Sequence, residues 1–342
     1  MLRLRIVVPV YNDWPSFRIL LRELDRVAAR LSTRIFVTAV DDGSTEQPDP
    51  AFNNFADIQN LEGAEIVHLA ANVGHQRAIA IGLCVAVTDD DFDAVLIMDA
   101  DGEDPPQSIE TLMQKIGQRT EFCIVAQRRK RTEKILFKVS YLLYKTLFRF
   151  VTGKTINFGN FSLLSRNYCQ RLVMVADLWN NLPAAILRSR LPITTVPLDR
   201  GRRYAGSSRM NFTSLVVHGL SGISVYADTI FIRLLVLTIA LTVFGAISVA
   251  TVLTLRIFFP VHATPGWATT VTFGLAIITL QVFFTALSSI LMLLHSRVQR
   301  LFVPIADFKL YLGSRQLLFG RSFGTHEKSS DWDRTLTTGS LS

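Results

Sequence analysis

Cysteine is scarce in this sequence, which has three among its 342 residues. Cys84, Cys123 and Cys169 lie far apart among apolar or mixed neighbours, and no CxxC pair occurs. This spacing gives little support to a zinc site or a disulfide framework, because both use cysteines in closely spaced or paired sets. We therefore expect three buried, reduced thiols.

The N-terminus lacks the apolar stretch of a signal peptide. Residues 1–5 alternate apolar and basic side chains and run directly into a strand-like segment. A secretory signal would need an apolar core of about 7–15 residues at this point. We expect the N-terminal domain to remain in the cytoplasm.

Acidic residues are in the minority, with 28 Asp and Glu against 36 Lys and Arg, so the net charge is +8. Such an excess could attract nucleic acid, anionic lipid or an anionic substrate. Basic residues gather at 128–154 and 200–209, whereas acidic residues gather at 41–42, 89–93 and 99–104. This separation predicts a basic side that faces a membrane bilayer and a separate acidic pocket, and it argues against nucleic acid as a partner.

Charge is absent from two long stretches, residues 234–255 and 268–294. Each stretch exceeds the roughly 20 residues that cross a bilayer. We predict transmembrane helices at 231–256 and 267–295. Gly245, with Ala246 and Ser248, would permit close helix packing, which leaves a homo-oligomer open.

The charges that flank these stretches predict their orientation. The loop between them carries one arginine, whereas Arg233 precedes the pair and Arg297 and Arg300 follow it. Because positive charge favours the cytoplasmic side, both ends should lie there. We expect an integral protein of the inner or plasma membrane, with a basic, partly disordered cytoplasmic tail at 296–342.

Short β-branched runs alternate with amphipathic segments in the first part of the chain. This alternation is typical of a parallel sheet flanked by helices, so we predict an α/β domain over residues 1–210. A juxtamembrane amphipathic segment should follow at 211–230. Residues 134–152 fit either an interfacial helix on the bilayer or an ordinary helix packed on the core. The runs predicted as strands are 6–10, 35–40, 66–69, 95–98 and 123–125.

The predicted strand at 95–98 ends in a group of acids. In open α/β sheets ligands bind beyond the carboxyl ends of the strands, so Asp99 and Asp101 should project into one crevice. Carboxylates there suit a divalent cation, Mg²⁺ or Mn²⁺, which takes its other ligands from substrate phosphates. Taken alone, such a motif is more often an acidic turn.

Two further strand ends carry polar residues, in VVPVYND at 7–13 and AVDDGS at 39–44. Each could be an ordinary turn or strand terminus. Because the carboxyl ends of parallel strands meet at one edge, the three ends should converge on one crevice. Together they favour a ligand site over three unrelated turns.

Six motifs in this order resemble glycosyltransferase family 2, in particular its polyprenyl-phosphate glycosyltransferases. They are VVPVYND at 7–13, VDDGS at 40–44, NVGHQRAIAIGL at 72–83, DADGEDPP at 99–106, NFGNFSLLSR at 157–166 and RRYAGSSR at 202–209. The resemblance covers about residues 4–230. It implies a GT-A type domain with a mostly parallel sheet, followed by a two-helix transmembrane hairpin.

The resemblance also implies roles for individual residues. Asp101 and Glu103 would be ligands of the metal. Arg203 and Arg209 would face the donor diphosphate or the lipid phosphate, and with Asp99 and Asp101 they are candidate catalytic residues. The nucleotide sugar would be lined by Pro9, Tyr11, Asp13, Val40, Asp42, Asp99 and Ala100.

Arg128 and Arg131 follow a predicted strand and could bind the acceptor phosphate, since guanidinium groups grip phosphate with two hydrogen bonds. A solvated basic loop near anionic lipid explains them equally well. His75 and His218 have no second ligand at metal-binding spacing, so each is expected to be a packed or exposed histidine.

Five positions depart from the family pattern. Glu103 stands where glutamine is usual, and Gly102 stands where a bulky apolar residue is usual. Asn157 and Asn160 occupy places that often hold aspartate, and Ser162 occupies one that often holds arginine. These changes add negative charge to the metal site and alter the acceptor region.

We therefore expect a membrane-anchored, metal-dependent glycosyltransferase that moves a hexose from a nucleotide sugar to a polyprenyl-phosphate lipid, with inversion. A lipid phosphate is already anionic, so its attack needs no strong base. A hydroxyl acceptor would need one, for which Asp104 or Asp177 is a candidate. The alternatives are a transferase for another lipid or glycan acceptor of the cell envelope, or a non-catalytic membrane pseudoenzyme.

Overall fold

The structure is a computed structural model, and the chain divides into two compact units. The first unit comprises Met1–Lys138, Ile156–Val225 and Phe302–Ser342, and the second comprises Val139–Thr155 and Tyr226–Leu301. Each unit is described by itself. The residues that the structure describes are 1–90, 92–128, 146, 149, 152–153, 157–205, 220–258, 266–298 and 300–320.

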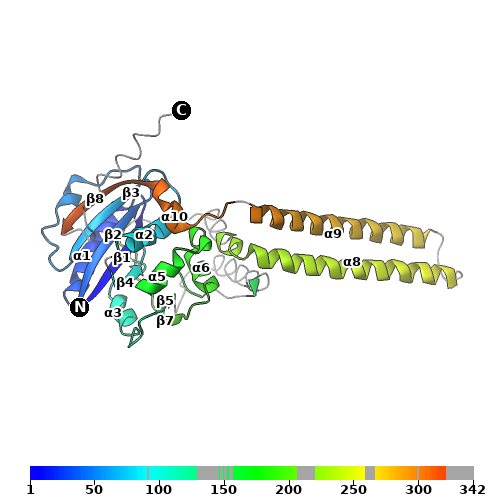
Figure 1. The fold of residues 1–342 in the computed structure, drawn as a ribbon, viewed down its shortest axis with the longest axis horizontal. Helices are drawn as coiled ribbons and strands as arrows, with labels where there is room; N and C mark the ends of the chain where they lie inside the picture. Colours follow the sequence, from blue (N-terminus) through cyan, green and yellow to red (C-terminus); the bar gives the residue numbers. More distant parts are fainter. Residues whose placement is uncertain are drawn as a thin grey trace, which may run out of the picture. The chain divides into compact units, whose positions relative to one another are not determined.

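The first unit is built on an eight-stranded sheet with the order β7-β5-β6-β4-β1-β2-β3-β8 (Figure 1). β6 runs antiparallel between β4 and β5, and β8 runs antiparallel to β3, whereas the other neighbours are parallel. The expected α/β fold with a mostly parallel sheet is confirmed. The strands are β1 (Leu2–Val10), β2 (Thr33–Asp41), β3 (Gly63–Leu69), β4 (Ala94–Ile97), β5 (Cys123–Arg128), β6 (Ser162–Ser165), β7 (Thr194–Leu198) and β8 (Leu312–Gly320).

Both faces of this sheet are buried. Successive residues of a strand point to opposite faces, so Ile6 and Val8 pack with α1 (Trp14–Ala28), whereas Val7 packs with α2 (His75–Asp89). This explains why the strands read as continuous apolar runs rather than as alternating ones. The remaining helices of this unit are η1 (Pro50–Asn53), α3 (Ser108–Met113), α5 (Arg166–Leu172), η2 (Ala176–Trp179), α6 (Leu182–Arg188), α10 (Pro304–Asp307) and η4 (Phe308–Tyr311).

The three cysteines are free and buried in the cluster that contains α2, as expected. Burial raises the pKa of the Cys123 thiol to about 12. Burial likewise raises the pKa values of Cys84 and Cys169. Thiols that stay protonated are inert at neutral pH, which agrees with a structural role.

One edge of the sheet gathers most of the loops that the sequence singled out. β1, β2, β3, β4, β5 and β7 all end at this edge, because each is parallel to the others, and β6 begins there. The residues that follow β7 therefore reach the loop that follows β4, although about 100 positions separate them in the sequence.

The segment after the long apolar helices corrects the expected tail at 296–342. α10, η4 and β8 fold back onto the first unit, where β8 lies beside β3 (Figure 1). Arg315 of β8 bridges Glu65 and Asp89, each at 2.7 Å. β8 is an edge strand with mostly exposed side chains, so its sequence lacks the apolar pattern of the inner strands. Residues 321–342 lie outside the described part of the chain.

The second unit contains α8 (Ala227–Phe258) and α9 (Trp267–Val298), each 32 residues long, which lie side by side (Figure 1). Both are long and apolar enough to cross a membrane, and they begin and end within about one turn of the predicted bounds. Gly245 allows close approach, because a Cβ there would lie 2.5 Å from Thr279 Oγ1. Most large apolar side chains of α8 and α9 are exposed, including Phe244 and Phe273 at 67% each.

Several predicted features fall outside the described residues. They include Arg131, Arg209 and His218, and most of the segment predicted at 134–152. The predicted segment at 211–230 is described only from residue 220 onward, where residues 220–224 are helical.

Candidate active site

The acidic turn after β4 is held by its own side chains. Asp101 is 8% exposed, and its Oδ1 accepts the Glu103 N–H at 2.9 Å. Asp104 is also buried, and its Oδ2 accepts the Asp99 N–H at 3.2 Å. Asp104 therefore shapes the turn. Asp177, the other acid considered as a base, lies on η2 and pairs with Arg188 at 3.1 Å.

Residues 200–204, called the covering segment below, lie directly over this turn. Gly201 N–H donates to the Glu103 carbonyl at 2.9 Å, and Tyr204 N–H donates to the Asp101 carbonyl at 2.8 Å. Gly102 has a φ of +86°, and a Cβ there would lie 2.8 Å from three carbons of the Tyr204 ring. The unusual glycine is thus required by the aromatic ring that packs on it.

The covering segment also brings two arginines to the acids. Arg203 Nε lies 3.2 Å from Asp101 Oδ2, and its Nη2 contacts the same oxygen. Arg200 forms an ion pair with Glu103, and Arg203 Nε lies 4.0 Å from Glu103 Oε1. The extra negative charge of Glu103 is therefore balanced by Arg200.

The pKa of Asp101 is raised, first by the burial of its carboxyl group. The neighbouring charges of Asp99 and Glu103 raise this pKa further, against the hydrogen bond from Arg203. A cation bound here would stabilise the charged form of these carboxyl groups. The carboxylate oxygens are hard ligands that suit Mg²⁺ or Mn²⁺, so the residues present fit such an ion.

No preassembled cluster of three or more His, Cys, Asp or Glu ligands exists among the described residues. This does not conflict with a cation site of the expected kind. Ions such as Mg²⁺ are usually held by one or two carboxylates and complete their shell with water and substrate phosphates. Asp101 and Glu103 would supply those two.

The loop after β2 is fixed by both of its aspartates. Asp42 accepts the N–H groups of Val73 at 2.7 Å and Gly74 at 3.0 Å, which anchors the loop that leads into α2. Burial raises the pKa of Asp42 despite these bonds. Asp41 accepts the Ser44 N–H at 2.9 Å and lies 2.8 Å from His68 Nδ1.

The loop after β1 is tied to the same loop. Asn12 has a φ of +50°, and its Oδ1 accepts the N–H groups of Thr45 and Glu46, each at 2.9 Å. Tyr11 is 44% exposed beside it. Burial would lower the pKa of Arg203, but the hydrogen bond to Asp101 and the charges of Asp101, Glu103 and Asp13 raise it. Asp13 therefore lies near the covering segment.

Three residues that the resemblance assigned to the nucleotide have buried side chains. Pro9 lies within β1, and Val40, opposite it on β2, is fully buried. Ala100 is 6% exposed. These residues could meet a ligand mainly through their backbone groups.

His75 is a site residue to which the sequence analysis gave no role. Its Nε2 lies 3.3 Å from Asp99 Oδ1 and 3.0 Å from Asn160 Nδ2. Burial alone would lower the pKa of His75, but the carboxylates, Asp99 first, raise it overall. The sequence pattern could have indicated a site role for His75. This residue begins the helix after β3, and the carboxyl end of β3 lies at the same sheet edge as that of β2.

Asn160 joins His75 to the protein interior. Its Oδ1 accepts from Gln76 Nε2 at 3.1 Å, and Gln76 Oε1 accepts the Leu182 N–H at 2.8 Å. Ser162, another departure from the family pattern, donates to the Asn160 carbonyl at 2.9 Å. The altered positions 160 and 162 therefore belong to one connected turn beside the acids.

Arg128 is the last residue of β5, so its backbone lies at the same sheet edge as the acids. Its side chain, like the whole of Arg131 and Arg209, lies outside the described part of the structure.

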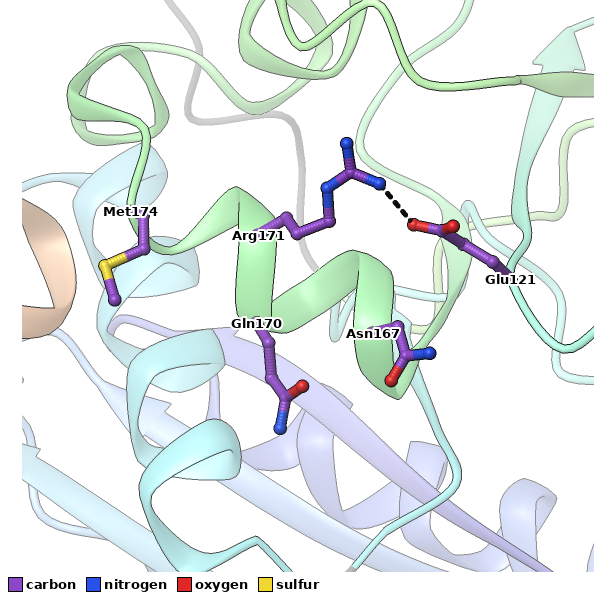
Figure 2. Close-up of a pocket in the computed structure, with 5 residues that line it drawn as sticks. All are labelled: Glu121, Asn167, Gln170, Arg171 and Met174. Carbon is purple, nitrogen blue, oxygen red and sulfur yellow. Dashed lines mark hydrogen bonds and ion pairs between the residues drawn. The ribbon is translucent and has the colours of Figure 1, made fainter.

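Two hollows differ in their relation to this site. A cavity of about 20 Å³, room for about one water molecule, adjoins the acidic turn. A shallow hollow of about 580 Å³ lies elsewhere, where Arg171 of α5 pairs with Glu121 at 2.9 Å (Figure 2). Because Glu121 precedes β5, this hollow is at the opposite sheet edge. The small cavity is lined by Glu103, Asp104, Pro105, Ala126, Gly159, Asn160, Phe161, Leu198, Asp199 and Arg200.

The fold and site define an α/β domain whose sheet carries, at its carboxyl edge, an acidic turn paired with two arginines. The chain belongs to glycosyl transferase family 2, whose model matches residues 5–177, slightly more than half of its length. The family predicted from the motifs is confirmed, and with it the GT-A type of the domain.

Curated relatives share modest identity with this chain. Undecaprenyl-phosphate 4-deoxy-4-formamido-L-arabinose transferase of Klebsiella pneumoniae is 25% identical over 223 residues, 63% of this chain and 64% of the relative. The chain thus matches just under two thirds of that protein's length. The glycosyltransferase YkcC of Bacillus subtilis is 22% identical over 313 residues, 90% of this chain and 92% of the relative.

Solved structures that show some similarity to this chain include mannosyl-3-phosphoglycerate synthase of Rubrobacter xylanophilus. It has a TM-score of 0.49 and 16% identity, and the match covers 66% of this chain and 73% of the synthase chain. Glucosyl-3-phosphoglycerate synthase of Mycobacterium tuberculosis, solved with Mn²⁺, UDP-glucose and phosphoglyceric acid, has a TM-score of 0.48 and 15% identity. The match covers 67% of this chain and 80% of that synthase chain.

Proposed function

We propose that this protein transfers a hexose from a nucleotide sugar to a polyprenyl-phosphate lipid at the cytoplasmic face of a membrane, with the help of a divalent cation. The observation that carries the proposal is the acidic turn after β4, which lies at the carboxyl edge of the sheet under Arg200 and Arg203. A crevice with both signs of charge suits a diphosphate bound through a cation.

In this proposal Asp101 and Glu103 hold the cation, Mg²⁺ or Mn²⁺, which when bound would compensate the charge of the leaving diphosphate. Arg203 and Arg209 bind the diphosphate, which lowers the cost of charge that develops as the glycosidic bond breaks. The nucleotide and sugar rest on residues of the strand ends: Pro9, Tyr11, Asp13, Val40, Asp42, Asp99 and Ala100. Buried Pro9, Val40 and Ala100 contribute mainly backbone groups.

The residues at positions 157 and 160 support a phosphate acceptor. Asn157 and Asn160 stand where aspartate, a possible general base, is common in the family. An anionic phosphate oxygen can attack the anomeric carbon without a strong base. Arg128 and Arg131 would hold this phosphate in line with the bond that breaks, which gives inversion. The Klebsiella relative, by its name, acts on undecaprenyl phosphate.

The hairpin supports membrane anchoring. Exposed apolar side chains along α8 and α9 need an apolar solvent to cover them. The chain leaves the first unit at Val225 and returns to it at Phe302. If both helices cross the bilayer, both ends of the hairpin must lie on the side of the catalytic domain, which the flanking arginines favour as the cytoplasm. A homo-oligomer through the hairpin remains part of the proposal.

The test is sugar transfer by the full-length protein in detergent. It is incubated with Mg²⁺ or Mn²⁺, undecaprenyl phosphate and a panel of radiolabelled donors: UDP-glucose, UDP-galactose, UDP-N-acetylglucosamine and GDP-mannose. We expect one donor to give an organic-extractable product that mild acid cleaves. Asp101→Asn should reduce the rate by about 100-fold or more, because it removes a charged ligand from the site.

The matched control is Glu110→Gln, which removes a carboxylate from an exposed position on α3. It should retain the wild-type rate. A product with an acid-stable linkage would mean that the sugar was transferred to a hydroxyl group of a lipid or glycan. The acceptor would then be of that alternative class, and polyprenyl phosphate would be wrong. A folded protein that binds a nucleotide sugar yet yields no product with any acceptor would identify a pseudoenzyme and refute the proposed activity.

A further inference from the structure

Two arginines lie where a cation at the acidic turn would have to be coordinated. Arg203 contacts Asp101 Oδ2 through both Nε and Nη2, and Arg200 contacts Glu103 Oε2. The four side chains together carry two positive and two negative charges. A divalent ion that binds both carboxylates must therefore displace at least part of these contacts.

The backbone of the covering segment is fixed, whereas its arginine side chains can rotate. Gly201 and Tyr204 are hydrogen-bonded to the turn at 2.9 and 2.8 Å, and Gly201 has no room for a Cβ, which would lie 2.1 Å from the Gly102 oxygen. The side chains of Arg200 and Arg203 are 33% and 28% exposed. Rotation about side-chain bonds can therefore release the carboxylates while the backbone stays in place.

We propose that Arg200 and Arg203 are exchangeable counter-charges, which neutralise Glu103 and Asp101 until a divalent cation replaces them and which then bind the donor diphosphate. This inference rests on the proposed function. Guanidinium groups bind carboxylate and phosphate with the same planar geometry, so one partner can substitute for the other. The cation alone then binds weakly, and cation and diphosphate each strengthen the binding of the other.

Arg200 also gives the unusual Glu103 a specific role. A third carboxylate beside Asp99 and Asp101 would repel them, and Arg200 cancels that repulsion. The contribution of Arg200 should therefore depend on Glu103. With glutamine at position 103 there would be no charge for Arg200 to balance.

The test measures Mn²⁺ binding to the full-length protein in detergent by electron paramagnetic resonance, with no nucleotide present. Arg200→Gln and Arg203→Gln should each tighten Mn²⁺ binding by about fivefold, because a competing charge is removed. Both side chains are partly exposed, so these changes leave the core intact. The matched control is Arg202→Gln, which removes an exposed arginine from the same segment and should leave the affinity within about twofold of wild type.

The Glu103→Gln background separates the two pairs. There, Arg200→Gln should have no further effect on Mn²⁺ affinity, whereas Arg203→Gln should keep its effect through Asp101. In a thermal-shift assay with saturating Mn²⁺, inorganic pyrophosphate should stabilise both single arginine variants less than it stabilises wild type or Arg202→Gln.

The outcomes distinguish this inference from the proposed function. Equal Mn²⁺ affinities for wild type, Arg200→Gln and Arg203→Gln would overturn the counter-charge role while leaving the cation site intact. If Arg202→Gln tightened Mn²⁺ binding as much as the other two variants, the affinity would depend only on the net charge of the segment. That result would also overturn the counter-charge role. If no Mn²⁺ binds to any of these proteins, then the cation of the proposed function is itself wrong.

Discussion

At the scale of single residues, Gly102 and Glu103 are both explained by contacts with the covering segment. Gly102 leaves space for the Tyr204 ring, and Glu103 pairs with Arg200. Both partners belong to the covering segment, whose position over the turn depends on two backbone hydrogen bonds. Both departures from the family pattern therefore depend on the position of this segment. The pKa of Tyr204, raised by burial to about 12, reflects how closely its ring is covered.

The pair of His68 and Asp41 should make stability depend on pH. The hydrogen bond to Asp41 raises the pKa of His68 above 6.5, although burial opposes it. Burial would raise the pKa of Asp41, but hydrogen bonds from His68 and Ser44 lower it below 3.8. The stabilisation from charged His68 is thus complete below about pH 6.5 and fades as the pH rises through its raised pKa, while that from charged Asp41 is complete above about pH 3.8 and fades below it.

We therefore expect His68→Gln to lower the melting temperature most between about pH 4.5 and 6.5, where both partners are charged. The difference from wild type should shrink steadily toward pH 9. The measurement is intrinsic fluorescence during heating, in buffers across this range. A difference that stayed constant with pH would show that the pair acts only as a neutral hydrogen bond.

At the scale of elements, β8 completes a buried ionic cluster that links the two ends of the first unit. Arg5 of β1 is 1% exposed and contacts Glu65 of β3 and, at 2.8 Å, Asp89 at the end of α2. Arg315 of β8 contacts the same two acids. The strand that follows the hairpin is therefore part of the first unit, and its Arg315 completes the cluster.

Arg5→Met should lower the free energy of unfolding by about 3 kcal/mol, because the acids lose a buried partner. For a unit of this size that corresponds to a fall of roughly 6–12 °C in melting temperature. The matched control is Arg3→Met on the same strand. Arg3 forms a partly exposed pair with Asp93, so its loss should cost less than about 1 kcal/mol. Equal effects of the two substitutions would refute a special role for the buried cluster.

At the scale of the whole molecule, the path of the chain constrains how it can sit in a membrane. Residues on both sides of the hairpin belong to one folded unit, while Gly266 directly precedes α9 in the chain. The three natural cysteines are buried, so an introduced cysteine can be labelled selectively.

We expect Leu310→Cys, at a position 77% exposed in the first unit, to react with a membrane-impermeant maleimide only from the cytoplasmic side. Gly266→Cys should react only from the opposite side. The measurement uses intact cells and inverted membrane vesicles, with labelling read on a gel. Reaction of both positions from the same side would mean that the helices do not cross the bilayer as a hairpin.

Much of the architecture could be predicted from the sequence, because it depends on local patterns. Strands β1 to β5 carry continuous apolar runs, and α8 and α9 are long and largely uncharged, so these elements were predicted close to their observed positions. β8 was missed, since an edge strand with exposed polar side chains has no such pattern. The short strands β6 and β7, of four and five residues, were also not predicted.

The sequence by itself determined the acidic turn at 99–104, the order of the motifs and the two apolar helices, because each is a property of neighbouring residues. The tertiary structure decided which distant residues meet this turn. Parallel pairing of β5 with β7 carries Arg200 and Arg203 to Glu103 and Asp101. The position of α2 brings His75 to Asp99. These contacts depend on strand order and direction, which spacing along the chain does not encode.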